Sequence, residues 1–267
     1  MSKDNAANCM LADRQNERDY REIAIDRVGI KDLLYPIAVR DLSQVIQHTV
    51  ARVEMTVDLP HHYKGTHMSR FVEILHSHGR EIQADQLFPI VHSLRTRLDA
   101  SAAHLILDFP YFIEKKAPVT ESRGLVDYGV TFVVTHEDGR DDFVLKIRVP
   151  LTTLCPCSKA ISAYGAHNQR GYVTVAIRSR ATVWIEELVK WVESCGSAEV
   201  FSLLKRADEK RVTELAYDHP VFVEDLVRNV ALKLNSEPRV TAYQIEAENI
   251  ESIHNHSAYA LVKKAWY

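Results

Sequence analysis

Several stretches of the chain alternate apolar and polar side chains, which is the pattern of a strand with one buried face. Residues 45–58 are an example, because Val53, Met55 and Val57 occupy every second position. The same pattern predicts further strands over residues 103–114, 125–136, 142–153, 171–180, 239–250 and 257–266. The chain is therefore rich in strands that need a hydrophobic layer on one side.

Other stretches space their apolar side chains as on one face of a helix. This spacing predicts helices over residues 86–99, 182–194 and 220–235. Pro89 and Pro220 lie near the starts of two of them, where a helix tolerates proline. The segment KGTHMSR is predicted as a loop that leads into a further helix start.

The order of the predicted elements repeats along the chain. Each half contains strand, strand, helix, helix, strand, strand, which predicts an α+β fold with helices on one face of an antiparallel sheet. The predicted halves are residues 35–138 and 139–267. Residues 1–34 are polar with weak periodicity, and we expect a mobile or loosely docked arm there. The remaining sheet faces and edges must be covered, which indicates self-association.

The composition narrows the classes of function. Among 267 residues, 46% are hydrophobic and 26% charged, as in an ordinary globular protein. A formal net charge of −3 argues against a general affinity for nucleic acid or acidic membranes. No apolar run approaches the roughly 20 residues that span a bilayer. The N-terminus has no apolar signal core, so we expect a cytoplasmic protein.

The segment LTTLCPCSKAISAYGAHNQRG, residues 151–171, is the most unusual part of the chain. Cys155 and Cys157 are too close together to form a disulfide framework. A thiolate and the imidazole of His167, presented from one loop, are typical ligands of zinc or a similar divalent ion. Alternatively, the cysteines are small core residues and His167 is a surface group, which is the commoner outcome for an isolated C-x-C pair.

Three other segments carry reactive side chains. Residues 246–256 hold three carboxylates with His254 and His256, which suits metal binding or proton transfer. Residues 205–214 include Glu209 in a run of charges. For such runs of charge taken alone, a solvated strand edge with its turn, and an exposed helix end, are the commoner outcomes.

The third is KGTHMSR, residues 64–70, which places donors beside a helix N-terminus and so suits a phosphate group. The donors are Lys64, His67, Ser69 and Arg70. The segment is not a Walker loop, and a capped helix start with charges facing water is the alternative.

Taken together, four segments in this order resemble the signature segments of GTP cyclohydrolase I, type IB. They are KGTHMSRF (64–71), LCPCSKAISAYGAHNQRG (154–171), FVEDLVR (222–228) and ENIESIHNHSAYA (248–260). The resemblance covers about residues 35–265. It implies a tunnelling fold with two ββααββ-type halves, and a homotetramer, a dimer of dimers, with active sites at subunit interfaces.

The resemblance also implies an activity and a set of site residues. Members of that family convert GTP and water to formate and 7,8-dihydroneopterin triphosphate, the first step toward folate and related pterins, with a divalent metal. Manganese, iron and zinc all suit the mixed donor set that the resemblance implies. The implied metal ligands are Cys155, His167, Glu209 and His254.

Further roles follow from the same resemblance. Glu224 is expected to hold guanine through two parallel hydrogen bonds, and His256 to supply a proton to N7. Cys155 is expected to take part in catalysis, in a role that stays open. The expected triphosphate contacts are Lys64, His67, Ser69 and Arg70, with Lys159 or Arg170 as further candidates.

Two alternatives remain. A related tunnelling-fold enzyme, such as a 7-cyano-7-deazaguanine reductase, also binds a purine-like ring through a glutamate, but uses a cysteine as a covalent nucleophile with NADPH. A pterin- or nucleotide-binding module without catalytic activity is the other alternative. Dependence of the activity on a metal or on NADPH separates the two enzymes.

Overall fold

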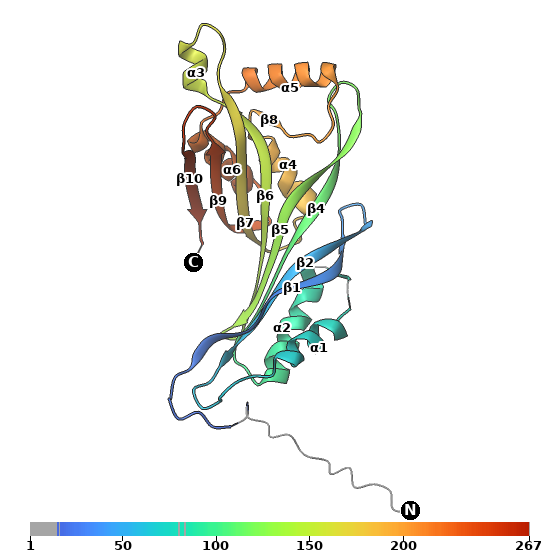
Figure 1. Ribbon diagram of the computed structural model, residues 1–267, viewed down its shortest axis with the longest axis vertical. Coiled ribbons are helices and arrows are strands. Elements are labelled where there is room, and N and C mark those ends of the chain that lie inside the picture. The colour runs from blue at the N-terminus through green and yellow to red at the C-terminus, as the bar shows by residue number, and fades with distance from the viewer. Residues whose placement is uncertain (1–14, 16, 80, 83, 267) are drawn as a thin grey trace, which may run out of the picture.

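The computed structural model describes residues 15, 17–79, 81–82 and 84–266. In these residues the chain folds around one large sheet with the order β10-β9-β7-β6-β5-β4-β2-β1-β3, and β8 pairs with β6 beside this path (Figure 1). The pairings are antiparallel except for the short parallel pair of β1 and β3. The predicted α+β class with an antiparallel sheet is confirmed.

The strands that form this sheet are β1 (Ile25–Arg40), β2 (Ile46–Leu59), β3 (Glu81–Ile82), β4 (Ala103–Lys116), β5 (Arg123–Glu137), β6 (Arg140–Leu154), β7 (Asn168–Ser179), β8 (Ala198–Glu199), β9 (Val240–Ile250) and β10 (Ser257–Lys264). The helices are α1 (Met68–Ser77), α2 (Ala84–Leu98), α3 (Pro156–Ile161), α4 (Ile185–Glu193), α5 (Arg206–Asp218) and α6 (Val223–Ser236). None of the helices in the described residues is long and apolar enough to cross a membrane.

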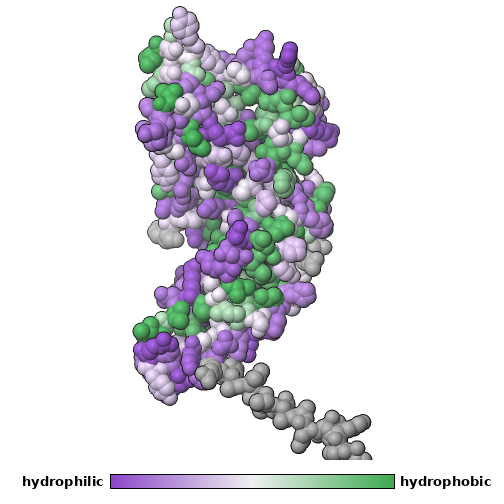
Figure 2. Space-filling model, viewed as in Figure 1, coloured by the Kyte–Doolittle hydropathy of each residue, from purple (hydrophilic) through white to green (hydrophobic). Residues whose placement is uncertain are grey.

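The alternation seen in the sequence decides which face of the sheet is buried. In β2, Val53, Met55 and Val57 are buried, whereas Val50 and Arg52, which precede them and alternate with buried Ala51, face outward and are exposed. The helices α1 and α2 pack beside β1, β2, β4 and β5, and α4 and α6 pack beside β6, β9 and β10. The inward side chains of sheet and helices form a single hydrophobic core. The outward face keeps a band of apolar residues (Figure 2).

The predicted helices over 86–99, 182–194 and 220–235 are confirmed as α2, α4 and α6, with small shifts at their ends. Two helices were not predicted. The helix α3 has only six residues, none of them buried. The helix α5 buries only Asp208 and Ala216, so it has no apolar stripe for sequence analysis to detect.

The predicted arm of residues 1–34 is wrong from Ile25 onward, because β1 begins there and pairs with β2. The register shifts twice, between Ile25 and Val28 and between Ile30 and Leu33, and such irregularities interrupt the two-residue period. At Gly29 the backbone of β1 lies very close to that of β2, because a Cβ atom there would lie 2.0 Å from the Met55 carbonyl oxygen. The expected mobility of residues 1–14 lies outside the described residues.

The predicted division at residues 138 and 139 falls on the turn between β5 and β6. The sheet continues across it, because β5 and β6 pair from Gly129 with Arg148 to Glu137 with Arg140. The short elements β3, α3, β8 and α5 add to the predicted order of elements. The arrangement as two ββααββ-type halves therefore stays a prediction.

Candidate active site

Cys155 lies where β6 ends and α3 begins. Pro156 fills the first position of that helix, where its missing N–H is not needed. Cys155 is the N-cap residue, with extended backbone angles, and its thiol accepts a hydrogen bond from the Ser158 amide at 3.4 Å. The thiol is therefore half-buried at a fixed place at the end of the sheet, whereas Cys157 is exposed.

His167 lies beside Cys155 because the chain folds back after α3. The Cys155 amide donates to the His167 carbonyl at 3.1 Å, and the His167 amide donates to the Ser158 hydroxyl at 3.3 Å. The His167 side chain is only 15% exposed. The two residues that sequence analysis paired are thus neighbours at the backbone.

The imidazole of His167 is held through its Nδ1 atom. This atom lies 3.0 Å from Gln169 Oε1 and 3.3 Å from Ser252 Oγ. It also lies 4.0 Å from a carboxylate oxygen of Glu251. Gln169 is itself buried and donates to Thr153 Oγ1 at 3.0 Å. With Nδ1 oriented in this way, Nε2 is the nitrogen that suits a metal.

The loop between β9 and β10 brings two further histidines to this end of the sheet. His254 and His256 are exposed, and their rings stack with centroids 5.1 Å apart at an interplanar angle of 19°. The same loop supplies Ser252, which contacts His167. Two of the predicted segments therefore meet in one chain.

Glu209 is exposed in the first turn of α5, and its neighbour Asp208 fixes that helix. The buried Asp208 carboxylate accepts hydrogen bonds from the amides of Lys205, Val119 and Thr120 and from the Thr120 hydroxyl. Burial opposes ionisation of Asp208, but the hydrogen bonds from Thr120 and the backbone outweigh it and hold its pKa below the ordinary value. The run of charges in residues 205–214 does not single out Asp208, although an acidic residue in the first turn of a helix is a recognised signal.

Glu224 is exposed in the first turn of α6, which follows α5. Lys159, on α3, reaches toward α5, with its Nζ atom 4.3 Å from the centroid of the Tyr217 ring. Arg170 is exposed on β7. The helices α3 and α5, which carry Lys159 and Glu209, lie at the same end of the molecule (Figure 1).

The predicted phosphate-binding segment lies elsewhere. His67 is the N-cap residue of α1, and Ser69 and Arg70 are in its first turn. Lys64 is exposed and forms an ion pair with Glu17. In Figure 1, α1 lies toward the opposite end of the molecule from α3. One chain therefore does not bring these residues to Cys155.

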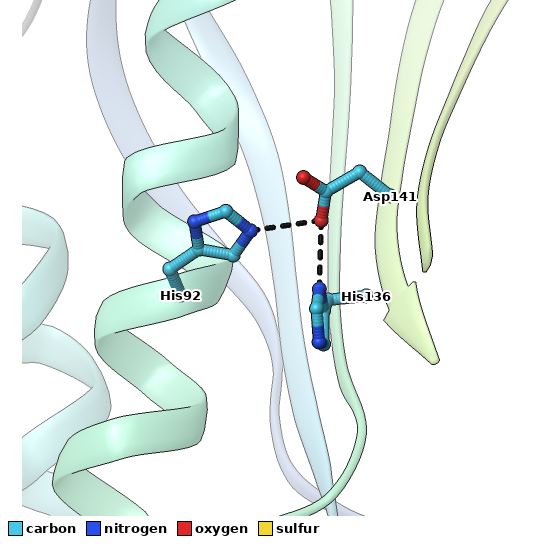
Figure 3. A group of neighbouring side chains, drawn as sticks. All are labelled: His92, His136 and Asp141. Atoms are coloured by element: carbon cyan, nitrogen blue, oxygen red, sulfur yellow. Dashed lines mark hydrogen bonds and ion pairs between the residues drawn. The ribbon is translucent and has the colours of Figure 1, made fainter. Parts of the chain in front are cut away.

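The four predicted metal ligands are also not gathered into one cluster in the single chain. Among the described residues, one group of ligand atoms lies within 4.8 Å of one another, and it consists of His92, His136 and Asp141 (Figure 3). Cys155 and His167 nevertheless offer a thiol and an oriented imidazole from adjacent backbone. This donor chemistry fits a borderline-soft divalent metal.

The fold places the chain in a wider class of α+β proteins. Uricase from Arthrobacter globiformis matches with a TM-score of 0.52 at 8% sequence identity, over 90% of this chain and 92% of that chain. Urate oxidase from Bacillus sp. TB-90 matches with a TM-score of 0.51 at 10% identity, over 90% and 99%. At such low identity the likeness shows the fold alone, so the chain has a uricase-like α+β fold.

Proteins found by sequence comparison share a far higher sequence identity with this chain than these structures do. A family model described as type I GTP cyclohydrolase folE2 matches residues 11–260. GTP cyclohydrolase FolE2 of Syntrophotalea carbinolica is 58% identical over 253 residues, which is 95% of each chain. GTP cyclohydrolase FolE2 of Geobacter sulfurreducens is 55% identical, over 95% of this chain and 98% of that protein. This chain belongs to the type I GTP cyclohydrolase FolE2 family.

Proposed function

We propose that this chain is a GTP cyclohydrolase that converts GTP to 7,8-dihydroneopterin triphosphate and formate, in the first step of folate and pterin synthesis. Membership in the family supports the activity. The contact between Cys155 and His167, beside the β9–β10 loop, supports our proposal that the active site lies at this end of the sheet.

A divalent metal is part of this proposal. Cys155, His167, Glu209 and His254 would hold it, and their sulfur, nitrogen and oxygen atoms suit manganese, iron or zinc. A bound metal supplies Lewis acidity that makes hydroxide available near neutral pH. Gln169 and Ser252 orient His167 for this role, because both contact its Nδ1 atom.

The other residues bind and orient GTP. A carboxylate at Glu224 can accept two parallel hydrogen bonds from the N1–H and the 2-amino group of guanine, and adenine has no equivalent pair of donors. His256 would supply to N7 the proton that makes C8 open to attack. The positive charges of Lys64 and Arg70, with His67 and Ser69 at the start of α1, suit the triphosphate.

The separation of α1 from α3 leads us to propose that the active site forms between subunits of a homotetramer. One subunit supplies Cys155 and His167, and a neighbour supplies the triphosphate contacts. The outward face of the sheet supports association, because it exposes a set of large apolar side chains. They are Leu34, Val50, Leu125, Tyr259 and Leu261.

Turnover of GTP by the chelated protein, resupplied in turn with manganese, iron and zinc, tests the proposal. We expect a metal to restore formate together with the fluorescence of the oxidised pterin. Absence of formate with every metal would contradict the proposed activity. NADPH-dependent reduction of a deazaguanine nitrile would then point to the reductase alternative.

A further inference from the structure

A second cluster of ligand-type side chains lies at the other end of β6. His92 comes from α2, His136 from the end of β5, and Asp141 from the start of β6, just after the turn that joins these two strands. Figure 3 shows both imidazoles directed at one carboxylate. Three separate elements therefore converge on a single point.

The geometry of this cluster is tight. His92 Nε2 lies 2.8 Å and His136 Nδ1 2.7 Å from the same oxygen, Asp141 Oδ1. The two rings meet edge to face, with centroids 5.1 Å apart and an interplanar angle of 88°. All three ligand atoms lie within 4.8 Å of one another.

Burial differs among the three side chains in a way that suits a metal site. His136 is only 8% exposed, so one ligand is fixed by the core. The side chains of His92 and Asp141 are 44% and 37% exposed, so solvent reaches the point where they converge. Water can therefore complete a coordination shell that has three protein ligands.

We propose that His92, His136 and Asp141 form a second divalent-metal site, separate from the active site, that takes Zn²⁺ or a similar first-row ion. Two imidazoles and one carboxylate are a ligand set that such ions accept. To bind the ion, each neutral imidazole would turn a lone pair toward it and carry its proton on the other ring nitrogen, and the ion would join α2 to the β5–β6 hairpin. Its role is to stabilise this end of the sheet.

This site is distinct from the one at Cys155. Asp141 stands near the start and Cys155 just after the end of β6, a strand of 15 residues. At about 3.3 Å per residue the two positions are about 45 Å apart in one chain. One ion cannot serve both sets of ligands within one chain, so two sites should give two equivalents of bound metal per chain.

The test is a titration of the chelated full chain with Zn²⁺ and, for its visible absorption spectrum, with Co²⁺. We expect two equivalents per chain in the natural sequence and one in the Cys155→Ala/His167→Ala variant. In His92→Gln and Asp141→Asn, the affinity of one equivalent should fall at least about tenfold. In these same two variants, His92→Gln and Asp141→Asn, GTP turnover should stay unchanged. The rise in melting temperature that Zn²⁺ produces should be smaller than in the natural sequence.

Asp138→Asn is the matched control, because this exposed turn residue lies beside the cluster and contributes no ligand to it. It should bind two equivalents. The proposal is overturned if His92→Gln and Asp141→Asn bind as much metal as the control, or if the Cys155→Ala/His167→Ala variant binds none. Failure of the cyclohydrolase assay would leave this result untouched, because the titration does not depend on turnover.

Discussion

The two ends of β6 differ in how sequence and structure describe them. At the end that carries Cys155, the family-like sequence segments predict the metal ligands. Among the described residues, however, the four predicted ligands do not form one cluster within a single chain. At the other end, no segment singles out His92, His136 or Asp141, yet their ligand atoms meet. At the Cys155 end the sequence identifies the residues but one chain does not complete the site. At the His92 end one chain completes the cluster but the sequence does not identify its residues.

The difference shows what each kind of information reports. A signature segment indicates residues that take part in a reaction, even when the other residues of the same site come from another copy of the chain. Convergence of side chains within one chain reports only what that chain can complete alone. We therefore interpret the Cys155 end as one part of a shared site, and the His92 end as a site that a single chain completes.

The largest expected effect is at Cys155. In Cys155→Ala, GTP turnover should fall by at least about a hundredfold, because the proposed site would lose a metal ligand that no neighbouring side chain replaces. The assay is formate release by the metal-loaded enzyme, with the oligomeric state measured in parallel. Cys157→Ala, which removes an exposed thiol two residues away, is the control and should turn over normally. Normal turnover in Cys155→Ala would remove that residue from the site.

A smaller effect is expected at Glu224. In Glu224→Gln, one of two hydrogen bonds to guanine should be lost, which lowers kcat/KM for GTP by about 10- to 100-fold. Steady-state kinetics with GTP measures the loss. Asp225→Asn is the control, since Asp225 pairs with Arg228 on the same helix at 3.1 Å. Equal effects of both changes would show that charge at the start of α6 matters rather than guanine recognition.

The effect at Arg70 should be smaller again and confined to binding. Arg70→Ala is expected to raise KM for GTP about tenfold with little change in kcat, because one charged contact to a phosphate, at the low end of its usual range, is worth about 1.5 kcal/mol. Arg97→Ala serves as the control, because this exposed arginine pairs with Glu73 on the helical surface. A fall in kcat with unchanged KM would place Arg70 near the reacting ring instead.

The smallest effect concerns stability at the end that carries His92. Asp58 accepts hydrogen bonds from the amides of Ser101 and Ala102, at 2.9 and 2.7 Å, and so fixes the connection into β4. Partial burial opposes ionisation of Asp58, but these bonds and one from the Ser101 hydroxyl outweigh it and lower its pKa. Asp58→Asn should therefore cost about 1–2 kcal/mol of unfolding free energy at pH 7.

The contribution of Asp58 to the free energy of unfolding should decrease as the pH falls. Because the folded pKa of Asp58 lies below the unfolded value of about 3.9, its stabilisation is complete above about pH 5 and is lost as the pH falls through the folded pKa. Denaturant unfolding at pH 7 and pH 3 should show the gap between the natural sequence and Asp58→Asn narrowing in acid. The exposed Asp138→Asn variant should show no such gap, and a gap that widens in acid would contradict the assignment.

Much of the fold follows from the sequence, because alternation in strands such as β2 and apolar stripes on α2, α4 and α6 arise directly from burial. The start of β1 could not be predicted, since its register shifts remove the period that reveals a strand. The helix α5 was hidden for a different reason, because it depends on hydrogen bonds to Asp208 more than on an apolar face.

The site divides in the same way. Cys155 and His167 are close in sequence, and the backbone joins them as the segment indicates. The contact of His167 with Ser252 joins residues 85 positions apart, and only the pairing of β7 with β9 creates it. The cluster at His92 depends on how α2 packs beside β5, which local pattern does not report.

The most direct test of a shared active site is complementation between two variants that each turn over GTP slowly when its concentration is held well below KM. Cys155→Ala and the double change Lys64→Ala/Arg70→Ala are expressed together, and GTP turnover of the mixed oligomer is compared with that of each variant alone. If a site takes Cys155 from one subunit and the triphosphate contacts from another, about a quarter of the sites in a random mixture are intact, and turnover should recover to that level. Turnover no higher than the mean of the separate variants would contradict the account, because both groups would then act within one chain.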